Sequence, residues 1–174
     1  MNILGIDPGN SGALAVLRCE GDQIDLVSVH SFPRLRRKVS GSAKEEIDLA
    51  GLCVLLRGLI DAKLTAYLER VGAMPGQGVS SMFTFGRAVG QVEALLVALG
   101  CPTQYVTPRI WKSRFSLTAE KDESLRVAKL LWPAQAYLFD LGNKRDSIAV
   151  AEAALIGRYG AERELALRRA VAVV

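Results

Sequence analysis

Three acidic residues, Asp7, Glu69 and Asp146, stand where the sequence predicts the ends of secondary-structure elements. Asp7 follows an apolar run and precedes Pro8-Gly9, so we expect it at the carboxyl end of a first strand, where open α/β sheets bind ligands. Converging carboxylates raise one another's pKa unless a cation keeps them ionised. Oxygen ligands without histidine or thiolate select Mg²⁺ or Mn²⁺, which activate water and stabilise the leaving oxygen of a phosphodiester.

Each acid also has a simpler explanation when it is taken alone. The Asp-Pro-Gly run at 7–9 is ordinary turn chemistry. Glu69 lies late in an apolar segment, where it is costly unless a metal or an ion pair, for instance with Arg70, compensates it. Asp146 opens a predicted helix, where the macrodipole favours an acid, although the alanines that follow would let this helix approach a sheet closely. The three acids are informative only together.

The chain contains few of the histidine and cysteine residues that other catalytic mechanisms and metal sites use. His30 is the one histidine, and the three cysteines, Cys19, Cys53 and Cys101, are far apart and form no CxxC pair. This spacing argues against a zinc site or a disulfide framework and favours a reducing compartment, so we expect a cytoplasmic protein. No apolar run approaches the ~20 residues of a membrane span, and the N-terminus lacks the features of a signal peptide.

The distribution of positive charge is more informative than the net charge of +4, which only weakly favours polyanionic partners. The basic residues gather in two clusters that could equally be solvated loops. The clusters are Arg34, Arg36, Arg37, Lys38 and Lys44, and then Arg109, Lys112, Arg114 and Lys121.

Hydrophobic periodicity predicts alternating strands and helices. The expected strands are 2–6, 13–17, 24–32, 64–71 and 103–107. The expected helices are 47–62, 80–99, 118–132 and 143–159, the last ended by Gly160. The basic, serine- and glycine-rich segment 33–44 is predicted to be a mobile loop, and 108–117 is left open.

This order predicts an α/β fold with a mixed five-stranded sheet, its first three strands antiparallel, flanked by helices. The first and fourth strands are expected to be neighbours, which would place Asp7 and Glu69 side by side. The length of 174 residues suits one domain. We expect that domain over 1–160, with 161–174 as its helical extension.

Four segments resemble the RuvC-type Holliday junction resolvases of the ribonuclease H-like superfamily. They are 3–9 (ILGIDPG), 68–71 (LERV), 85–90 (FGRAVG) and 144–151 (KRDSIAVA), and they occur in the family's order within 1–160. A further segment, 74–81, is similar to versions of the family carried by bacteriophages.

The resemblance implies that Asp7, Glu69 and Asp146 are catalytic and bind Mg²⁺, with two ions expected and Mn²⁺ able to substitute. The family's fourth ligand lies one helical turn before the last aspartate, where this chain has Asn143. Its amide oxygen can bind a metal without adding charge, and Asp140 is the alternative. The implied enzyme is a homodimer that makes paired nicks in four-way or branched DNA and leaves 5′-phosphate and 3′-hydroxyl ends.

The same resemblance places Lys112 and Lys121 near DNA phosphates. An apolar side chain is expected near the junction centre, and Met74, Met82 and Phe83 are candidates, although the last two could equally belong to the core. The second long helix, with Gly86, Ala88 and Gly90, is a candidate for the dimer interface. The other residues predicted to bind DNA are Arg36, Arg37, Lys38 and Arg114.

Three other functions compete with this hypothesis. The run 5–12 (GIDPGNSG) also resembles the phosphate-binding hairpin of sugar kinases and actin-like ATPases, but the chain lacks their second domain and second glycine-rich loop. Asn143 would suit a junction-binding protein that does not cut. A general or debranching nuclease would use the same acids, because substrate geometry depends on dimer spacing and loop shape.

Overall fold

The central sheet has five strands: β1 (Asn2–Asp7), β2 (Ala13–Glu20), β3 (Gln23–Ser31), β6 (Leu64–Glu69) and β7 (Thr103–Val106). The computed structural model describes residues 1–9, 11–39, 42–72, 76–118, 120 and 122–172. The strand order is β3-β2-β1-β6-β7, antiparallel from β3 to β1 and parallel from β1 to β7. The predicted mixed α/β sheet is therefore confirmed, including the pairing of the first and fourth predicted strands.

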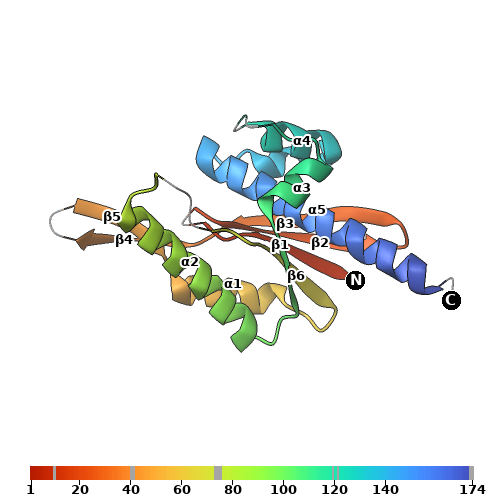
Figure 1. Ribbon diagram of the computed structural model, residues 1–174, viewed down its shortest axis with the longest axis horizontal. Helices are drawn as coiled ribbons and strands as arrows, with labels where there is room; N and C mark the ends of the chain where they lie inside the picture. The colour runs from red at the N-terminus through yellow and green to blue at the C-terminus, as the bar shows by residue number, and fades with distance from the viewer. Residues whose placement is uncertain (10, 40–41, 73–75, 119, 121, 173–174) are drawn as a thin grey trace.

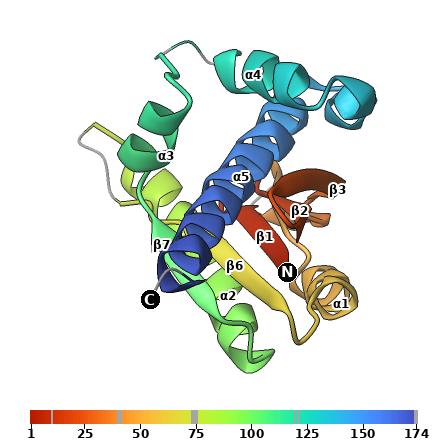
Figure 2. The ribbon, with the colours of Figure 1, turned by 90° about the vertical axis from the view of Figure 1, so that its right-hand side faces the viewer.

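Helices cover both faces of this sheet (Figure 2). α5 (Lys144–Ala172) crosses one face, and α1 (Leu49–Leu59) and α2 (Val79–Ala98) cover the other. Three short helices pack around the N-terminal half of α5: α3 (Pro108–Arg114), α4 (Glu123–Leu131) and the 3₁₀ helix η1 (Pro133–Phe139). No helix in the described ranges combines the length and apolar character that crossing a bilayer requires.

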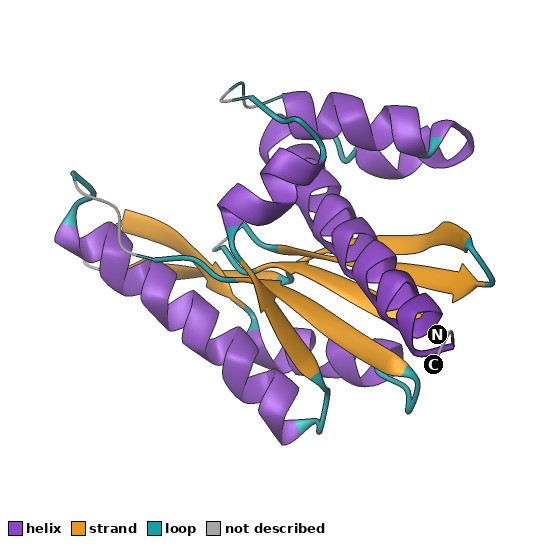
Figure 3. Ribbon diagram, turned by 45° about the vertical axis from the view of Figure 1, so that its right-hand side comes forward, coloured by secondary structure: helices purple, strands orange, loops and turns teal. Residues whose placement is uncertain are grey.

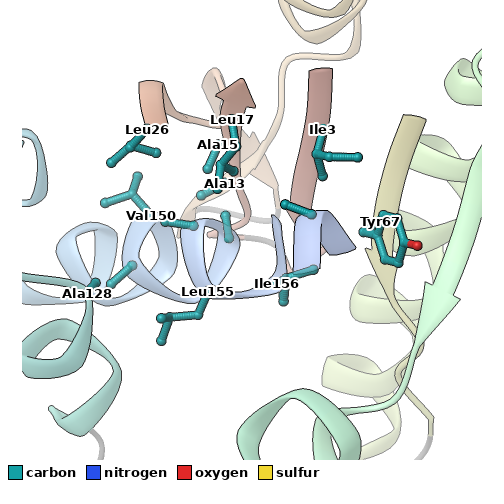
Figure 4. Packing of buried hydrophobic residues seen from close by; sticks show 14 of the residues in the cluster. Ile3, Ala13, Ala15, Leu17, Leu26, Tyr67, Ala128, Val150, Leu155 and Ile156 are labelled. Atoms are coloured by element: carbon teal, nitrogen blue, oxygen red, sulfur yellow. The ribbon is translucent and has the colours of Figure 1, made fainter. Parts of the chain in front are cut away.

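Alternation along the strands divides the buried side chains between two cores. Ile3 and Tyr67 belong to the core under α5 (Figure 4), whereas Leu4 and Ile6 belong to the core under α1 and α2. Asp7 is in phase with Ile3, so its side chain lies on the α5 face. The same alternation that builds the core therefore directs the side chain of Asp7 towards α5.

Small residues bring α5 into direct contact with β1. A Cβ atom on Gly5 would lie 2.0 Å from the carbonyl oxygen of Ala153, and one on Gly157 would lie 2.3 Å from a methyl carbon of Leu17. Ala153 and Ala154 are fully buried. The alanine run therefore does what the sequence predicted, and it holds the helix beside the strand that carries Asp7.

The predicted mobile loop over 33–44 is wrong. β4 (Arg34–Val39) and β5 (Ser42–Ile47) instead pair as an antiparallel two-stranded sheet of their own, which we call the ribbon. It projects beyond the five-stranded sheet near the N-terminal end of α2 (Figures 1 and 3). Strand propensity is low here, and ion pairs stabilise the pairing, including Arg36 Nε with Glu45 Oε1 at 3.4 Å.

The predicted helix ends also need correction. Gly160 does not stop α5, which continues to Ala172. A Cβ atom on Gly160 would lie 2.5 Å from the ring of Tyr67, so this glycine makes room for an aromatic ring and does not act as a cap. α4 begins at Glu123, later than predicted, because Glu123 accepts a 2.5 Å hydrogen bond from the hydroxyl of Thr118.

Candidate active site

Asp7 and Glu69 end two neighbouring parallel strands. The register of β1 and β6 pairs Ile6 with Leu68, so the two acids occupy the next corresponding positions. Glu69 is in phase with Tyr67, which packs under α5, so both carboxylates lie on the α5 face of the sheet. The expected neighbourhood of Asp7 and Glu69 is confirmed.

The third carboxylate of this site is that of Glu152, on α5. Glu152 and Asp7 line one pocket together with Ala149. Burial, followed by the negative charges of Glu69 and Glu152, raises the pKa of Asp7 from its ordinary 3.8 to about 8. Burial and Glu152 also raise the pKa of Glu69. Asp7, Glu69 and Glu152 therefore form one electrostatically coupled cluster, which we call the acidic cluster.

Helix α3 contributes two side chains that hold this cluster. Trp111 is fully buried, and its indole Nε1 donates a 2.7 Å hydrogen bond to Glu69 Oε1. This bond counteracts part of the rise in the pKa of Glu69. Lys112 Nζ lies 3.3 Å from Glu152 Oε1, and its charge lowers the pKa of both Asp7 and Glu69. A donor and a cation thus orient the carboxylates and offset their repulsion.

Asp146, which was expected beside Asp7 and Glu69, has an arginine and an amide as its hydrogen-bond partners in this structure. Its Oδ2 accepts hydrogen bonds from Arg34 Nη2, at the start of the ribbon, and from Asn143 Nδ2 at 2.9 Å. Burial acts to raise the pKa of Asp146, but Arg34 and Asn143 outweigh it and lower that pKa. Positions 146 and 152 point about 120° apart around a helix, so the two acids face different surroundings. An unpredicted strand, β4, supplies the counterion of Asp146.

The two candidates for a fourth ligand have other partners. Asn143 Oδ1 accepts a 2.9 Å hydrogen bond from the backbone N–H of Asp146, so Asn143 caps the first turn of α5. Asp140 accepts a 2.6 Å hydrogen bond from Lys129 Nζ. Sequence reasoning missed Glu152, although the argument used for Glu69 applies to it. Glu152 is the only acid in the apolar run 148–156 (IAVAEAALI).

The acidic cluster has the donor chemistry of a magnesium site. Its three members are carboxylates, and burial together with the repulsion between them raises the pKa of Asp7 and of Glu69. Among the residues that the structure describes, no three acidic, histidine or cysteine side chains are already arranged to hold one ion. Lys112 pairs with Glu152 at this point. A hard divalent cation fits such a cluster by taking over the neutralising role of the Lys112 ammonium.

Comparison with known proteins identifies the fold. No protein-family model matches the sequence, and a search of curated proteins found no significant match. RuvC of Thermus thermophilus, solved in complex with a Holliday junction substrate, superposes with a TM-score of 0.57 at 16% identity, over 92% of this chain and 98% of that one. This chain has the RuvC fold. The predicted resemblance is thus confirmed for the ribonuclease H-like architecture.

Two further solved structures are similar to the chain. Another Thermus thermophilus RuvC structure has 19% identity and a TM-score of 0.49, over 92% of this chain and 98% of that chain. The yeast mitochondrial Holliday junction resolvase Ydc2 has 15% identity and a TM-score of 0.47, over 97% of this chain and 83% of that chain.

On this RuvC fold, the residues predicted to contact DNA occupy several different places. Arg36 is 81% exposed on the ribbon, and Arg37 is exposed beside it. Lys112 lies at the acidic cluster, whereas Arg114 Nε lies 2.8 Å from Glu162 Oε2. Phe83 is 72% exposed on α2. Met82 lines a groove with Phe85 and Val89. The backbone of Lys38 belongs to β4, and Met74 and Lys121 lie outside the described residues.

The raised pKa of Asp7 predicts a pH-dependent stability in the absence of metal. The folded protein holds a proton on Asp7 up to pH about 8, whereas the unfolded chain releases it near pH 3.8. The free energy of unfolding should therefore fall as pH rises through this window. In EDTA, we expect urea unfolding to show a steeper loss of stability from pH 5 to pH 8 for the wild type than for Asp7→Asn. Parallel pH curves would contradict the proposed coupling of the three acids.

Proposed function

We propose that this chain is a divalent-metal-dependent endonuclease that resolves Holliday junctions, acting in the cytoplasm of a bacterial or phage-infected cell. The observation that carries the proposal is the meeting of Asp7, Glu69 and Glu152 at the ends of two parallel strands. The RuvC fold supports DNA as the substrate, because the Thermus thermophilus relative was solved with a Holliday junction substrate. Hydrolysis would leave 5′-phosphate and 3′-hydroxyl ends.

Asp7, Glu69 and Glu152 would hold the Mg²⁺ ions, two when the site is full, and Mn²⁺ would substitute. Bound ions supply an activated water and stabilise the leaving oxygen of the phosphodiester. Trp111 fixes the Glu69 carboxylate in one orientation through its 2.7 Å hydrogen bond. Lys112, whose Nζ lies 3.3 Å from Glu152 Oε1 at the edge of this cluster, would contact a phosphate oxygen of the scissile strand. Each phosphate neutralised in this way steepens the salt dependence of binding.

An exposed apolar stripe on α2 supports a homodimer. Val79, Phe83 and Val97 are 87%, 72% and 81% exposed. Gly86 and Gly90 lie between them at helical spacing, and a Cβ atom on either would meet nothing within 4 Å. Ala88, which the sequence suggested for this interface, is instead 2% exposed in the core under α1 and α2. A second copy packing on this stripe by two-fold symmetry would present two acidic clusters to one junction.

The stripe yields a test of the dimer. A charge at Phe83 would be buried without a partner in the dimer but solvated in the monomer. We therefore expect Phe83→Asp to sediment at half the mass of the wild type and to nick junctions singly, without the paired cuts. Arg87→Gln, on the neighbouring face of α2, is the control and should remain dimeric. A dimeric Phe83→Asp would place the interface elsewhere.

The proposed function is tested by incubating the purified protein with four-way, three-way and linear DNA, with Mg²⁺, with Mn²⁺ and with EDTA. We expect paired, ligatable nicks in the four-way junction, dependent on either metal. Equal cutting of three-way DNA would assign a general debranching nuclease instead. Metal-independent binding without nicks would assign a junction-binding protein, and ATP turnover without nicks would assign an ATPase.

A further inference from the structure

The ribbon separates its charges along its length. Positions 34 to 44 contain five cationic residues and no acid, and the acids Glu45 and Glu46 follow directly at the base of β5. The ribbon is paired only within itself and belongs to no other sheet. Its outer part is therefore a cationic projection from the body of the protein.

Ion pairs hold the base of the ribbon to the body on two sides. Glu45 Oε2 lies 3.2 Å from Arg145 Nη2, and the guanidinium of Arg34 bonds the carboxylate of Asp146, both on α5. Glu46 Oε1 lies 3.1 Å from Arg87 Nη2 on α2. These helices cover opposite faces of the sheet, so the base is braced from both faces. The acids of the ribbon and Arg34 are thus engaged at its base, whereas Arg36 and Arg37 are exposed.

The cations of the outer ribbon are arranged for a polyanion. Arg36 is 81% exposed. Arg37, the next residue of the same strand, is exposed as well. Side chains at 36 and 37 point to opposite faces of the ribbon. A partner carrying negative charge on both sides of the ribbon would neutralise them together.

We propose that the ribbon inserts into the major groove of a duplex arm of the DNA substrate, next to the acidic cluster. The proposal rests on the proposed function. A B-form major groove is about 12 Å wide and admits a two-stranded ribbon, with phosphates on both walls. Arg145 joins the two regions, because it pairs with Glu45 and lines the pocket that contains Asp7 and Glu152. An arm held on the ribbon therefore leads its strand towards the acidic cluster.

The test compares two double variants that lose the same charge. Arg36→Gln/Arg37→Gln removes two cations from the ribbon, and Arg163→Gln/Arg168→Gln removes two exposed cations from the C-terminal half of α5. Binding to a four-way junction in EDTA is measured over a range of salt concentrations, so no cutting is needed. We expect the ribbon variant to bind about tenfold more weakly at 0.1 M salt and to lose about two units of logarithmic salt slope. The α5 variant should show a much smaller change in both the affinity at 0.1 M salt and the salt slope.

Two further measurements separate groove insertion from simple charge attraction. Hydroxyl-radical footprinting should show protection on a duplex arm that disappears in the ribbon variant only. An RNA duplex of the same sequence has a deep, narrow major groove, so its binding should change little in either variant. Equal losses for the two variants, or an equal loss on RNA, would overturn the proposal. Failure of the wild type to cut with Mg²⁺ while these binding contrasts hold would instead refute the nuclease and leave the ribbon assignment standing.

Discussion

Junction cleavage should fall about a thousandfold when Asp7 is replaced by Asn, which corresponds to about 4 kcal/mol of activation free energy. Asp7 is at the centre of the acidic cluster, since both Glu69 and Glu152 raise its pKa. The amide has the shape of the carboxylate but brings no charge, so the cluster would bind Mg²⁺ weakly and place it poorly. Single-turnover cleavage of a labelled four-way junction measures the effect.

Junction binding provides the control for this variant. Asp7→Asn removes a negative charge near the scissile phosphate, so the affinity for the junction in Ca²⁺ or EDTA should stay the same or increase. Retained binding also shows that the variant is folded. Full cleavage activity in this variant would refute the assignment of the acidic cluster as the catalytic site.

The second large effect is expected at Glu152, and it decides which acid of α5 serves the site. Glu152→Gln should lower cleavage about a hundredfold or more, because it removes a carboxylate that interacts with both Asp7 and Glu69. The measurement is single-turnover cleavage over a Mg²⁺ titration, in which the variant should also need a higher concentration of the ion.

Asp146→Asn is the matched comparison, since it changes the other acid in the first turns of the same helix. Asp146 contacts Arg34 and Asn143, so its loss should weaken junction binding through the ribbon and leave the Mg²⁺ dependence of cleavage where it was. Removing one partner of a buried ion pair costs about 3 kcal/mol, so the free energy of unfolding should fall as well. A larger cleavage defect in Asp146→Asn than in Glu152→Gln would restore Asp146 as the third ligand.

The two acids of α5 show why the sequence pointed to Asp146 and not to Glu152. The helix dipole favours an acid at a helix N-terminus whether or not that acid is functional. The position of Asp146 therefore made it a candidate without being evidence for a catalytic role. Glu152 lies among alanines in the interior of the helix, where a charged side chain is costly unless a specific partner compensates it. Which of the two turns towards β1 depends on the rotation of α5 about its axis. That rotation is set by the contact of Gly5 with Ala153 and Gly157.

The ribbon is a second example of what local pattern could not reveal. Residues 33–44 lack apolar alternation and carry serine and glycine at the centre, so they favour a loop. Their strands are stabilised by Glu45 and by residues distant in sequence, such as Arg145 and Arg87. Long-range ion pairs leave no periodic signal in the segment that they order.

The sequence by itself determined the strands and the places of Asp7 and Glu69 at strand ends, because alternation along a strand is a local property. The pairing of the first and fourth strands could be predicted because few connections between strands and helices are allowed in such a fold. Only the tertiary structure decided the approach of Glu152 to Asp7 and Glu69, the counterion of Asp146 and the ordering of the ribbon. Each of these depends on how separate elements are rotated and docked against one another, and side-chain packing over the whole chain sets that arrangement.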